Sequence, residues 1–235
     1  MRTAWLHRLS AATPSCCAVC GGWPARPLCG ACTTRFARPQ PRCRHCALPV
    51  PDGQAQCGAC ARQPAPLDAC FAAVSYGYPW STLVARFKFQ GEPGWAAGLA
   101  GLMREVPGAA REIAGADLLL PMPLGPRRLA ERGFNQALQL ARQLAPTKTD
   151  ARLLLRLRDT PAQASLDRAA RQANVRGAFG VEPLRADQLR GKAVLLVDDV
   201  MTSGASLYTA AQALRAAGAQ RVAAVALART DDPAA

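Results

Sequence analysis

One stretch near the carboxyl end of the chain constrains the fold more than any other. A short apolar run, residues 194–197, is followed by the adjacent carboxylates Asp198 and Asp199 and by a turn of small and hydroxyl residues, 202–206. An apolar run of this length predicts a buried strand with both faces covered, as in a parallel sheet packed between helices. Residues 207–217 predict a helix. The stretch therefore predicts an α/β fold.

The order of strand, acidic pair, turn and helix also predicts a binding site. In open α/β sheets, ligands bind outside the carboxyl ends of the strands. A turn of small residues lets backbone N–H groups approach an anion, and the helix behind it adds the positive end of its dipole. We therefore expect a phosphate at the turn formed by Thr202, Ser203, Gly204, Ala205 and Ser206.

The acidic pair suits hydroxyl groups or a hydrated Mg²⁺ ion. Because neighbouring side chains of a strand point to opposite faces, Asp198 and Asp199 can converge only if the strand ends near Asp198. The alternative interpretation is that a hydroxyl residue merely caps the helix and the pair is solvated. The turn is not a Walker loop, since it lacks the Gly-Lys-Ser/Thr ending.

Eight of the ten cysteines form four Cys-x-x-Cys pairs: Cys17 and Cys20, Cys29 and Cys32, Cys43 and Cys46, Cys57 and Cys60. This spacing predicts two tetrahedral zinc sites, each with four thiolates. Disulfides are the alternative, and the poor secretory signal at the amino terminus disfavours them. Sequential grouping of the pairs is simpler than interleaved grouping, and both remain open. Cys16 and His45 are expected to be bystanders, and Cys70 a buried thiol.

Length and composition suggest two domains. A chain of 235 residues can hold one full α/β domain and a smaller module. We expect a Cys-rich double zinc-ribbon module at residues 1–68, which would need metal to fold, and the α/β domain at residues 69–235. The longest apolar run is far shorter than the roughly 18 residues of a membrane span, so we expect a cytoplasmic protein without transmembrane segments.

The net charge of +13 is unevenly distributed. Residues 1–70 carry 8 basic and 2 acidic side chains, residues 121–176 carry 11 and 4, and the remaining segments are balanced. Such concentration fits a polyanion site or a nucleic-acid footprint, and ordinary solvated surface is the alternative.

Basic residues also follow the second predicted strand, residues 117–120. Arg128 and Arg132 are four residues apart and share a helix face, where like charges repel unless an anion lies between them. Arg127 belongs to the same group. Lys88, in a predicted helix at residues 80–89, is a weaker candidate for an anion site.

Three segments of the chain resemble known proteins. Residues 194–206 resemble the phosphoribosyl pyrophosphate (PRPP) signature of type I phosphoribosyltransferases. Residues 121–136, with Pro-Met-Pro-Leu and Arg-Gly-Phe-Asn-Gln, and residues 160–179, with a Thr-x-x-Gln-x-x-Leu…Gly-Ala-Phe pattern, are similar to segments of the ComF competence family. That family couples an amino-terminal zinc module to a phosphoribosyltransferase-type domain. With the cysteines, the resemblance covers residues 17–206.

The resemblance implies roles for particular residues. Asp198 and Asp199 would contact the ribose hydroxyls and help to hold Mg²⁺, and the turn would hold the 5-phosphate of PRPP. The candidates for the pyrophosphate, or for the phosphates of a nucleic-acid backbone, are Arg127, Arg128, Arg132, Arg171 and, more weakly, Lys88. Arg171 would act from a loop that closes over the ligand.

Two functional hypotheses follow from the resemblance. In the first, a phosphoribosyltransferase-fold protein binds a phosphoribosyl or nucleotide ligand and serves DNA uptake in natural transformation. Its partners would be single-stranded DNA and, through the zinc module, proteins of the uptake machinery. In the second, the chain is a Mg²⁺-dependent, PRPP-using transferase with an unknown acceptor and no role in handling DNA. Whether the protein catalyses transfer is left open by the sequence.

Overall fold

The computed structural model describes residues 15–158 and 177–231. The chain forms two compact units, Met1–Arg38 and Pro39–Ala235. Helix α2 (Gly30–Phe36) lies in the first unit, and α3 (Gly58–Arg62) lies in the second. The second half of the predicted Cys-rich module therefore belongs to the unit that contains the α/β fold. Independent folding of residues 1–68 stays a prediction.

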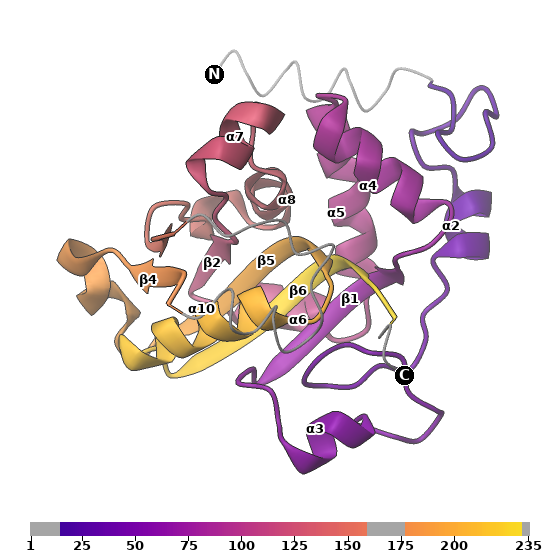
Figure 1. The fold of residues 1–235 in the computed structure, drawn as a ribbon. Coiled ribbons are helices and arrows are strands. Elements are labelled where there is room, and N and C mark those ends of the chain that lie inside the picture. Colours follow the sequence, from indigo (N-terminus) through magenta and orange to yellow (C-terminus); the bar gives the residue numbers. More distant parts are fainter. Residues whose placement is uncertain (1–14, 159–176, 232–235) are drawn as a thin grey trace. The chain divides into compact units, whose positions relative to one another are not determined.

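A four-stranded parallel sheet forms the centre of the larger unit (Figure 1). Its order is β1-β6-β5-β2, and every neighbouring pair is parallel, which confirms the predicted mostly parallel α/β fold. The strands are β1 (Ala69–Ser75), β2 (Leu118–Pro121), β5 (Ala193–Met201) and β6 (Arg221–Arg229).

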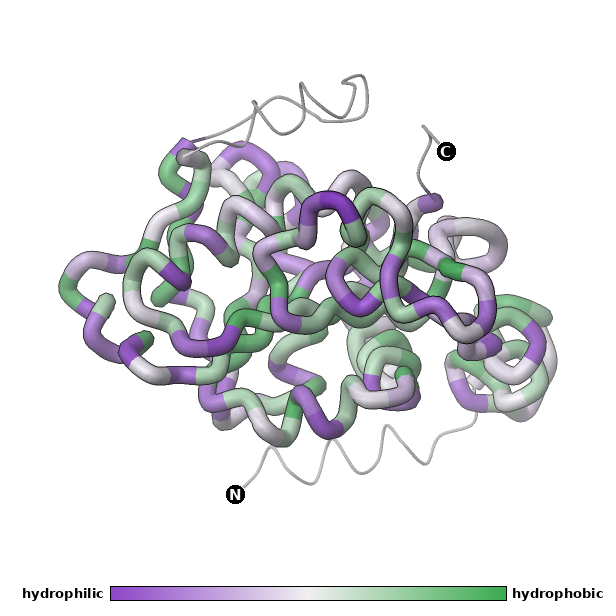
Figure 2. The backbone as a smooth tube through the Cα atoms, turned by 90° about the horizontal axis from the view of Figure 1, so that it is seen from below, coloured by the Kyte–Doolittle hydropathy of each residue, from purple (hydrophilic) through white to green (hydrophobic). Residues whose placement is uncertain are grey.

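Helices cover both faces of this sheet. Helices α5 and α8 pack against the strands and against each other, and α10 packs on β5 and β6. The helices of this unit after α3 are α4 (Trp80–Phe89), α5 (Ala96–Glu105), α6 (Ala109–Gly115), α7 (Pro126–Arg132), α8 (Gln136–Leu144) and α10 (Ala205–Ala216), with 3-10 turns η1 (Pro93–Trp95), η2 (Pro146–Lys148) and η4 (Pro183–Leu189). Hydrophilic and hydrophobic residues are interspersed along the described part of the backbone (Figure 2).

Helices α5 and α6 are separate, because α5 ends at Glu105 and α6 begins only at Ala109. Pro107 and Gly108 lie between them, and Gly108 has a left-handed φ of +85°. Residues 160–176 of the segment similar to the ComF family lie outside the described residues.

A second, two-stranded sheet pairs β3 (Leu154–Arg156) with β4 (Phe179–Val181) in antiparallel fashion. Strand β4 has only three residues, and no sequence pattern indicated it. A strand this short has no clear alternation of polar and apolar residues, and its pairing partner is distant in sequence.

The second group of cysteines shares a hydrophobic core with the sheet. The core residues that belong to the cysteine segment are Cys43, Cys46, Ala47, Val50, Cys60 and Leu67. In the same cluster lie Leu196 of β5, Ala224 of β6 and Leu207 of α10. Residues 43–67, which contain the second group of cysteines, are therefore buried against the sheet and α10 and not only against one another.

Candidate ligand pocket and cysteine clusters

The candidate pocket opens where β5 continues beyond β2. Strand β2 pairs with β5 only as far as Pro121 and Val197, and the Met122 amide then donates to the Val197 carbonyl at 2.9 Å. Strand β6 continues to pair with β5 as far as Met201. The strand therefore does not end near Asp198, which was the condition for the two aspartates to converge, and both nevertheless line the cavity described below. The two aspartates lie on the part of β5 that pairs with β6 but no longer with β2.

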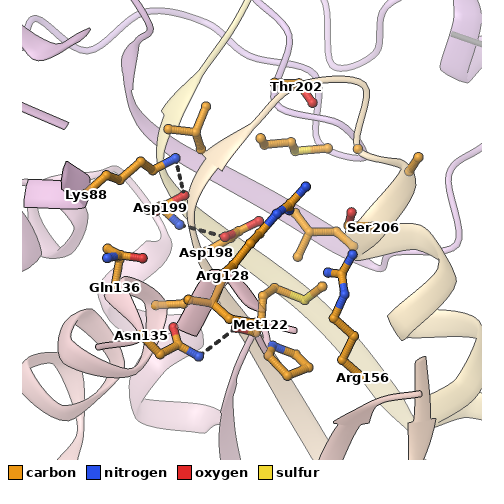
Figure 3. A pocket seen from close by; sticks show the side chains of 18 of the residues that line it. Lys88, Met122, Arg128, Asn135, Gln136, Arg156, Asp198, Asp199, Thr202 and Ser206 are labelled. Carbon is orange, nitrogen blue, oxygen red and sulfur yellow. Dashed lines mark hydrogen bonds and ion pairs between the residues drawn. The ribbon is translucent and has the colours of Figure 1, made fainter. Parts of the chain in front are cut away.

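A cavity of about 310 Å³ lies at this edge (Figure 3). It is lined by residues from the ends of β1, β2, β3, β5 and β6 and from α4, α7, α8 and α10. The predicted site residues that line it are Lys88, Arg128, Arg132, Asp198, Asp199, Thr202, Gly204, Ala205 and Ser206. Residues separated by more than a hundred positions in the chain therefore meet at one site.

The acidic pair occupies two different environments. The Lys88 Nζ atom lies 2.9 Å from Oδ1 of Asp199, and both side chains are largely buried. Asp198 accepts a hydrogen bond of 2.9 Å from the backbone amide of Asp199. Removal from water, together with repulsion by Asp199, raises the pKa of Asp198 to about 7. Asp198 is therefore protonated more readily than an exposed aspartate, while Lys88 compensates the charge of Asp199.

The turn after β5 depends on one glycine. Gly204 has a left-handed φ of +80° and caps the start of α10. A Cβ atom at this position would lie 2.6 Å from the Met201 Cε and from the Cζ of Tyr208. A larger residue would therefore force these side chains to move and would strain the backbone. Gly204 and the first residues of α10 line the cavity.

Basic side chains surround the rest of the cavity. Arg128 and Arg132 of α7 both line it, as expected from their shared helix face. Arg156 of β3, which the sequence reasoning missed, lines it as well. Arg128 and Arg156 extend into the cavity on the side of Ser206 (Figure 3). Arg156 belongs to the two-stranded sheet and lies in no recognisable sequence motif, so its basic charge is the only signal that could have indicated it.

Some predicted site residues lie elsewhere. Arg127 is not among the residues that line the cavity, and its Nε atom pairs with Glu131 at 2.9 Å on an exposed face of α7. Ser203 is also not a lining residue, and its hydroxyl accepts from the Ala205 amide at 3.4 Å. Arg171 lies outside the described residues.

The Arg-Gly-Phe-Asn-Gln segment places Arg132 at the cavity. Gly133 ends α7 with a left-handed φ of +76°. Asn135 caps α8 by accepting from the Leu138 amide, and it donates to the Met122 carbonyl at 3.0 Å. Gln136, only 1% exposed, accepts from Arg132 Nη1 at 2.9 Å.

An aromatic contact fixes the same segment. The rings of Phe134 and Phe87 lie 5.7 Å apart, which joins the segment between α7 and α8 to α4. The Arg132 guanidinium also lies over the ring of Phe89, 5.2 Å from its centroid. These contacts hold the arginine and Lys88, which precedes Phe89, on neighbouring parts of the cavity wall.

The eight cysteines of the four Cys-x-x-Cys pairs form two groups of four. One comprises Cys17, Cys20, Cys29 and Cys32, and the other comprises Cys43, Cys46, Cys57 and Cys60. Within each group the sulfur atoms lie within 4.8 Å of one another. The grouping is sequential, not interleaved. Cys16, Cys70 and His45 belong to neither group.

The donor geometry of both groups fits zinc. Zn–S bonds of about 2.3 Å in a tetrahedron separate the sulfur atoms by about 3.8 Å. The Cys20 and Cys29 sulfurs lie 3.9 Å apart, and those of Cys46 and Cys57 lie 3.6 Å apart. Four thiolate ligands are the donor set that structural zinc prefers. Both groups could therefore hold a zinc ion.

Backbone amides donate hydrogen bonds to sulfur atoms of the first group. The Cys29 amide donates to the Cys17 sulfur, and the Cys32 amide donates to the Cys29 sulfur, each at 3.4 Å. Burial alone would raise the pKa of Cys17, but the amide hydrogen bonds, that of Cys29 first, outweigh it and lower this pKa to about 6. Thiolates are the metal-binding form of cysteine, so these amides favour coordination.

Comparison with known proteins identifies the class and then the family. A model of the phosphoribosyl transferase domain matches residues 129–235, which agrees with the parallel sheet and the turn after β5. DNA utilization protein YhgH of Salmonella typhimurium (strain LT2) is 32% identical over 209 residues, which cover 86% of this chain and 90% of that protein. The Escherichia coli (strain K12) protein of the same name is 30% identical over the same shares.

Competence protein F of Haemophilus influenzae is 30% identical over 210 residues, again 86% of this chain and 90% of that protein. The class is thus a phosphoribosyltransferase-type domain with an amino-terminal Cys-rich region. The chain belongs to the ComF competence family. In residues 15–158 and 177–231, no helix has the length and apolar character needed to cross a bilayer.

We predict two bound zinc ions per chain, one for each group of four cysteines. Cys29→Ser and Cys57→Ser should each reduce the zinc content by one ion, because each removes one of four thiolates from a different group. Native mass spectrometry of the full chain measures the count. The matched control is Cys16→Ser, which should leave the zinc content unchanged. A loss of zinc in this control would contradict the grouping.

We also predict that Gly204→Ala reduces the free energy of unfolding by about 1–3 kcal/mol, because it adds a Cβ to a left-handed residue in close contact with Met201 and Tyr208. Chemical denaturation measures this change. Gly101, within α5, has open space around its Cα, so Gly101→Ala should be neutral or stabilising. Equal effects of the two substitutions would show that the turn is not constrained as described.

Proposed function

We propose that the cavity binds the phosphoribosyl part of a nucleotide-like ligand and that the protein uses this site in handling DNA. The observation that carries the proposal is the meeting of Asp198, Asp199 and the turn at Gly204 in one cavity. Carboxylates suit ribose hydroxyls, and the amino-terminal end of the 12-residue helix α10 suits a phosphate.

The charge of the cavity supports this ligand. Arg128, Arg132 and Arg156 line it together with Lys88, and among the described residues two acidic side chains, Asp198 and Asp199, accompany them. One of these two carboxylates already pairs with Lys88. A ligand with several phosphates would therefore meet an excess of positive charge, whereas its sugar hydroxyls would meet Asp198 and Asp199.

Mg²⁺ fits the same arrangement. It prefers one or two carboxylates together with water and phosphate oxygens, and Asp198 and Asp199 are the carboxylates of the cavity. When bound, it would supply positive charge to phosphate oxygens. The chain itself would orient the ribose through the two aspartates and hold the phosphate at the turn.

The role in DNA handling rests on relatives. One relative is named for DNA utilization (YhgH) and another for competence (Competence protein F), and the similarity covers nine-tenths of each of those proteins. Single-stranded DNA presents sugars and phosphates that the same cavity could accept. Proteins of the uptake machinery are further partners that we propose for the Cys-rich region, and the cytoplasm is the expected location.

A second candidate function is transfer of the phosphoribosyl group. In this reaction a nitrogen nucleophile forms a bond to ribose C1 while the bond from C1 to pyrophosphate breaks. Arg128, Arg132 and Arg156 lie in the cavity, where they could stabilise the charge that grows on the departing pyrophosphate. The contribution of the chain would then be positioning and charge stabilisation, without a covalent intermediate.

We predict that the full chain binds PRPP in the presence of Mg²⁺ and that Asp199→Asn weakens this binding by about tenfold or more, because it removes a charged hydrogen-bond acceptor. Isothermal titration calorimetry measures the affinity. Arg127→Ala is the matched control, since Arg127 lies outside the cavity lining, and it should bind like the wild type. Absence of binding to PRPP and to ribose 5-phosphate in the wild type would refute the proposed ligand.

Binding of DNA gives a separate prediction. Single-stranded oligonucleotides should bind in a salt-dependent manner, and Arg128→Ala should reduce the slope of log affinity against log salt concentration by about 0.7 for one lost phosphate contact. PRPP should compete with the oligonucleotide if both use the cavity. Pyrophosphate release from PRPP with an amine or base, without any oligonucleotide binding, would instead favour the transferase.

A further inference from the structure

Arg229, the last residue of β6, is a buried charge with only 3% of its surface exposed. Its Nε atom donates to the Cys46 carbonyl at 2.9 Å. Its Nη1 atom donates to the carbonyl of Met201 at 3.3 Å, and also to that of Thr202. A single guanidinium thus joins the second group of cysteines to the turn that follows β5.

These bonds are costly to lose. A guanidinium is planar, and its donors have fixed directions, so it holds its acceptors at defined relative positions. Removal of one partner would leave a buried charge or a buried carbonyl without compensation. The carbonyl of Cys46 and the carbonyls of Met201 and Thr202 are therefore fixed relative to one another through Arg229.

Side-chain packing links the same parts of the fold. The Cys70 thiol lies 3.6 Å from the Met201 sulfur. A Cβ atom on Gly204 would lie 2.6 Å from side-chain atoms of Met201 and Tyr208, so these side chains leave little room at the turn. Cys46, Cys70 and Met201 belong to one buried cluster. A displacement of Cys46 would thus be transmitted to a turn that has little space to adapt.

We propose that Arg229 is a positioning residue through which zinc in the second group of cysteines sets the geometry of the turn at residues 202–206. Zinc fixes the four sulfur positions, and the Cys46 carbonyl follows the position of its own thiolate. Without the ion, no bond holds the four sulfur atoms together and Cys46 can move. Arg229 then loses an acceptor and holds the turn less firmly. The zinc site thereby acts on ligand binding without touching the ligand.

Hydrogen exchange of the turn amides tests the proposal without a ligand. In the zinc-loaded full chain, Arg229→Met should accelerate exchange at residues 202–206 about tenfold, because about 1–2 hydrogen bonds that anchor the turn are lost. Arg229→Lys keeps the charge but not the planar set of donors, and its exchange rate at the turn should lie between those of the wild type and Arg229→Met. Leu214→Ala, a buried substitution later in α10, controls for general destabilisation and should leave the turn at the wild-type rate.

A double-mutant cycle tests whether zinc acts through Arg229. Cys57→Ser removes a ligand of the second group and should accelerate exchange at the turn in the wild-type background, but add little to it in Arg229→Met. Cys20→Ser, in the first group, should have no effect on the turn. Additive effects of Cys57→Ser and Arg229→Met would overturn the proposal. If Cys57→Ser does not fold, partial removal of zinc by a chelator from wild type and from Arg229→Met gives the same comparison.

The consequence for binding rests on the proposed function. Calorimetry with ribose 5-phosphate should show about tenfold weaker binding by Arg229→Met, with wild-type zinc content. A wild type that binds neither ribose 5-phosphate nor PRPP would defeat the proposed function, while the exchange experiment would still decide the coupling. Unchanged affinity and unchanged exchange in Arg229→Met would overturn the coupling alone.

Discussion

The pairing of β5 with β6 along nine residues is the constraint on which the site depends. Because β2 stops at Pro121, β5 keeps its hydrogen bonds on one side only from Asp198 to Met201. A strand supported on one side stays ordered, yet its free edge can face a cavity. The acidic pair therefore occupies a rigid strand and not a loop, and the turn at Gly204 begins from a fixed point.

The cavity joins two kinds of chemistry that are usually separate. It is lined by Asp198, whose pKa is raised to about 7, and by Asp199, which Lys88 neutralises. Guanidinium groups and the start of α10 line the same cavity. Acidic acceptors beside cationic donors would collapse into ion pairs if they were free to move. The hydrogen bond from Arg132 to the buried Gln136 limits the movement of one of these cations, so that a molecule with both hydroxyls and phosphates could contact carboxylates and guanidinium groups together.

Local sequence patterns predicted most of the helices and strands, but not the boundaries that depend on tertiary contacts. The helix expected at residues 80–89 matches α4, since its boundaries are set by its own residues. The end of β5 was misjudged because β6, a partner later in the chain, extends it. Arg156 was missed because antiparallel pairing with β4 decides where it points. The sharing of one core by the second cysteine group and the sheet likewise depends on contacts between residues far apart in sequence.

The family motif between α7 and α8 is mainly a device for positioning. Gly133 allows the chain to turn, Asn135 caps α8 and anchors the exit of β2, and Gln136 holds Arg132. None of these three roles requires a reaction, and a transferase and a DNA-binding protein would need them equally. The motif therefore determines the position of the Arg132 guanidinium in the cavity. Tyr76 and Thr230, which also line the cavity, lie outside this motif, so substitutions there address the choice between binding and transfer separately from the positioning of Arg132.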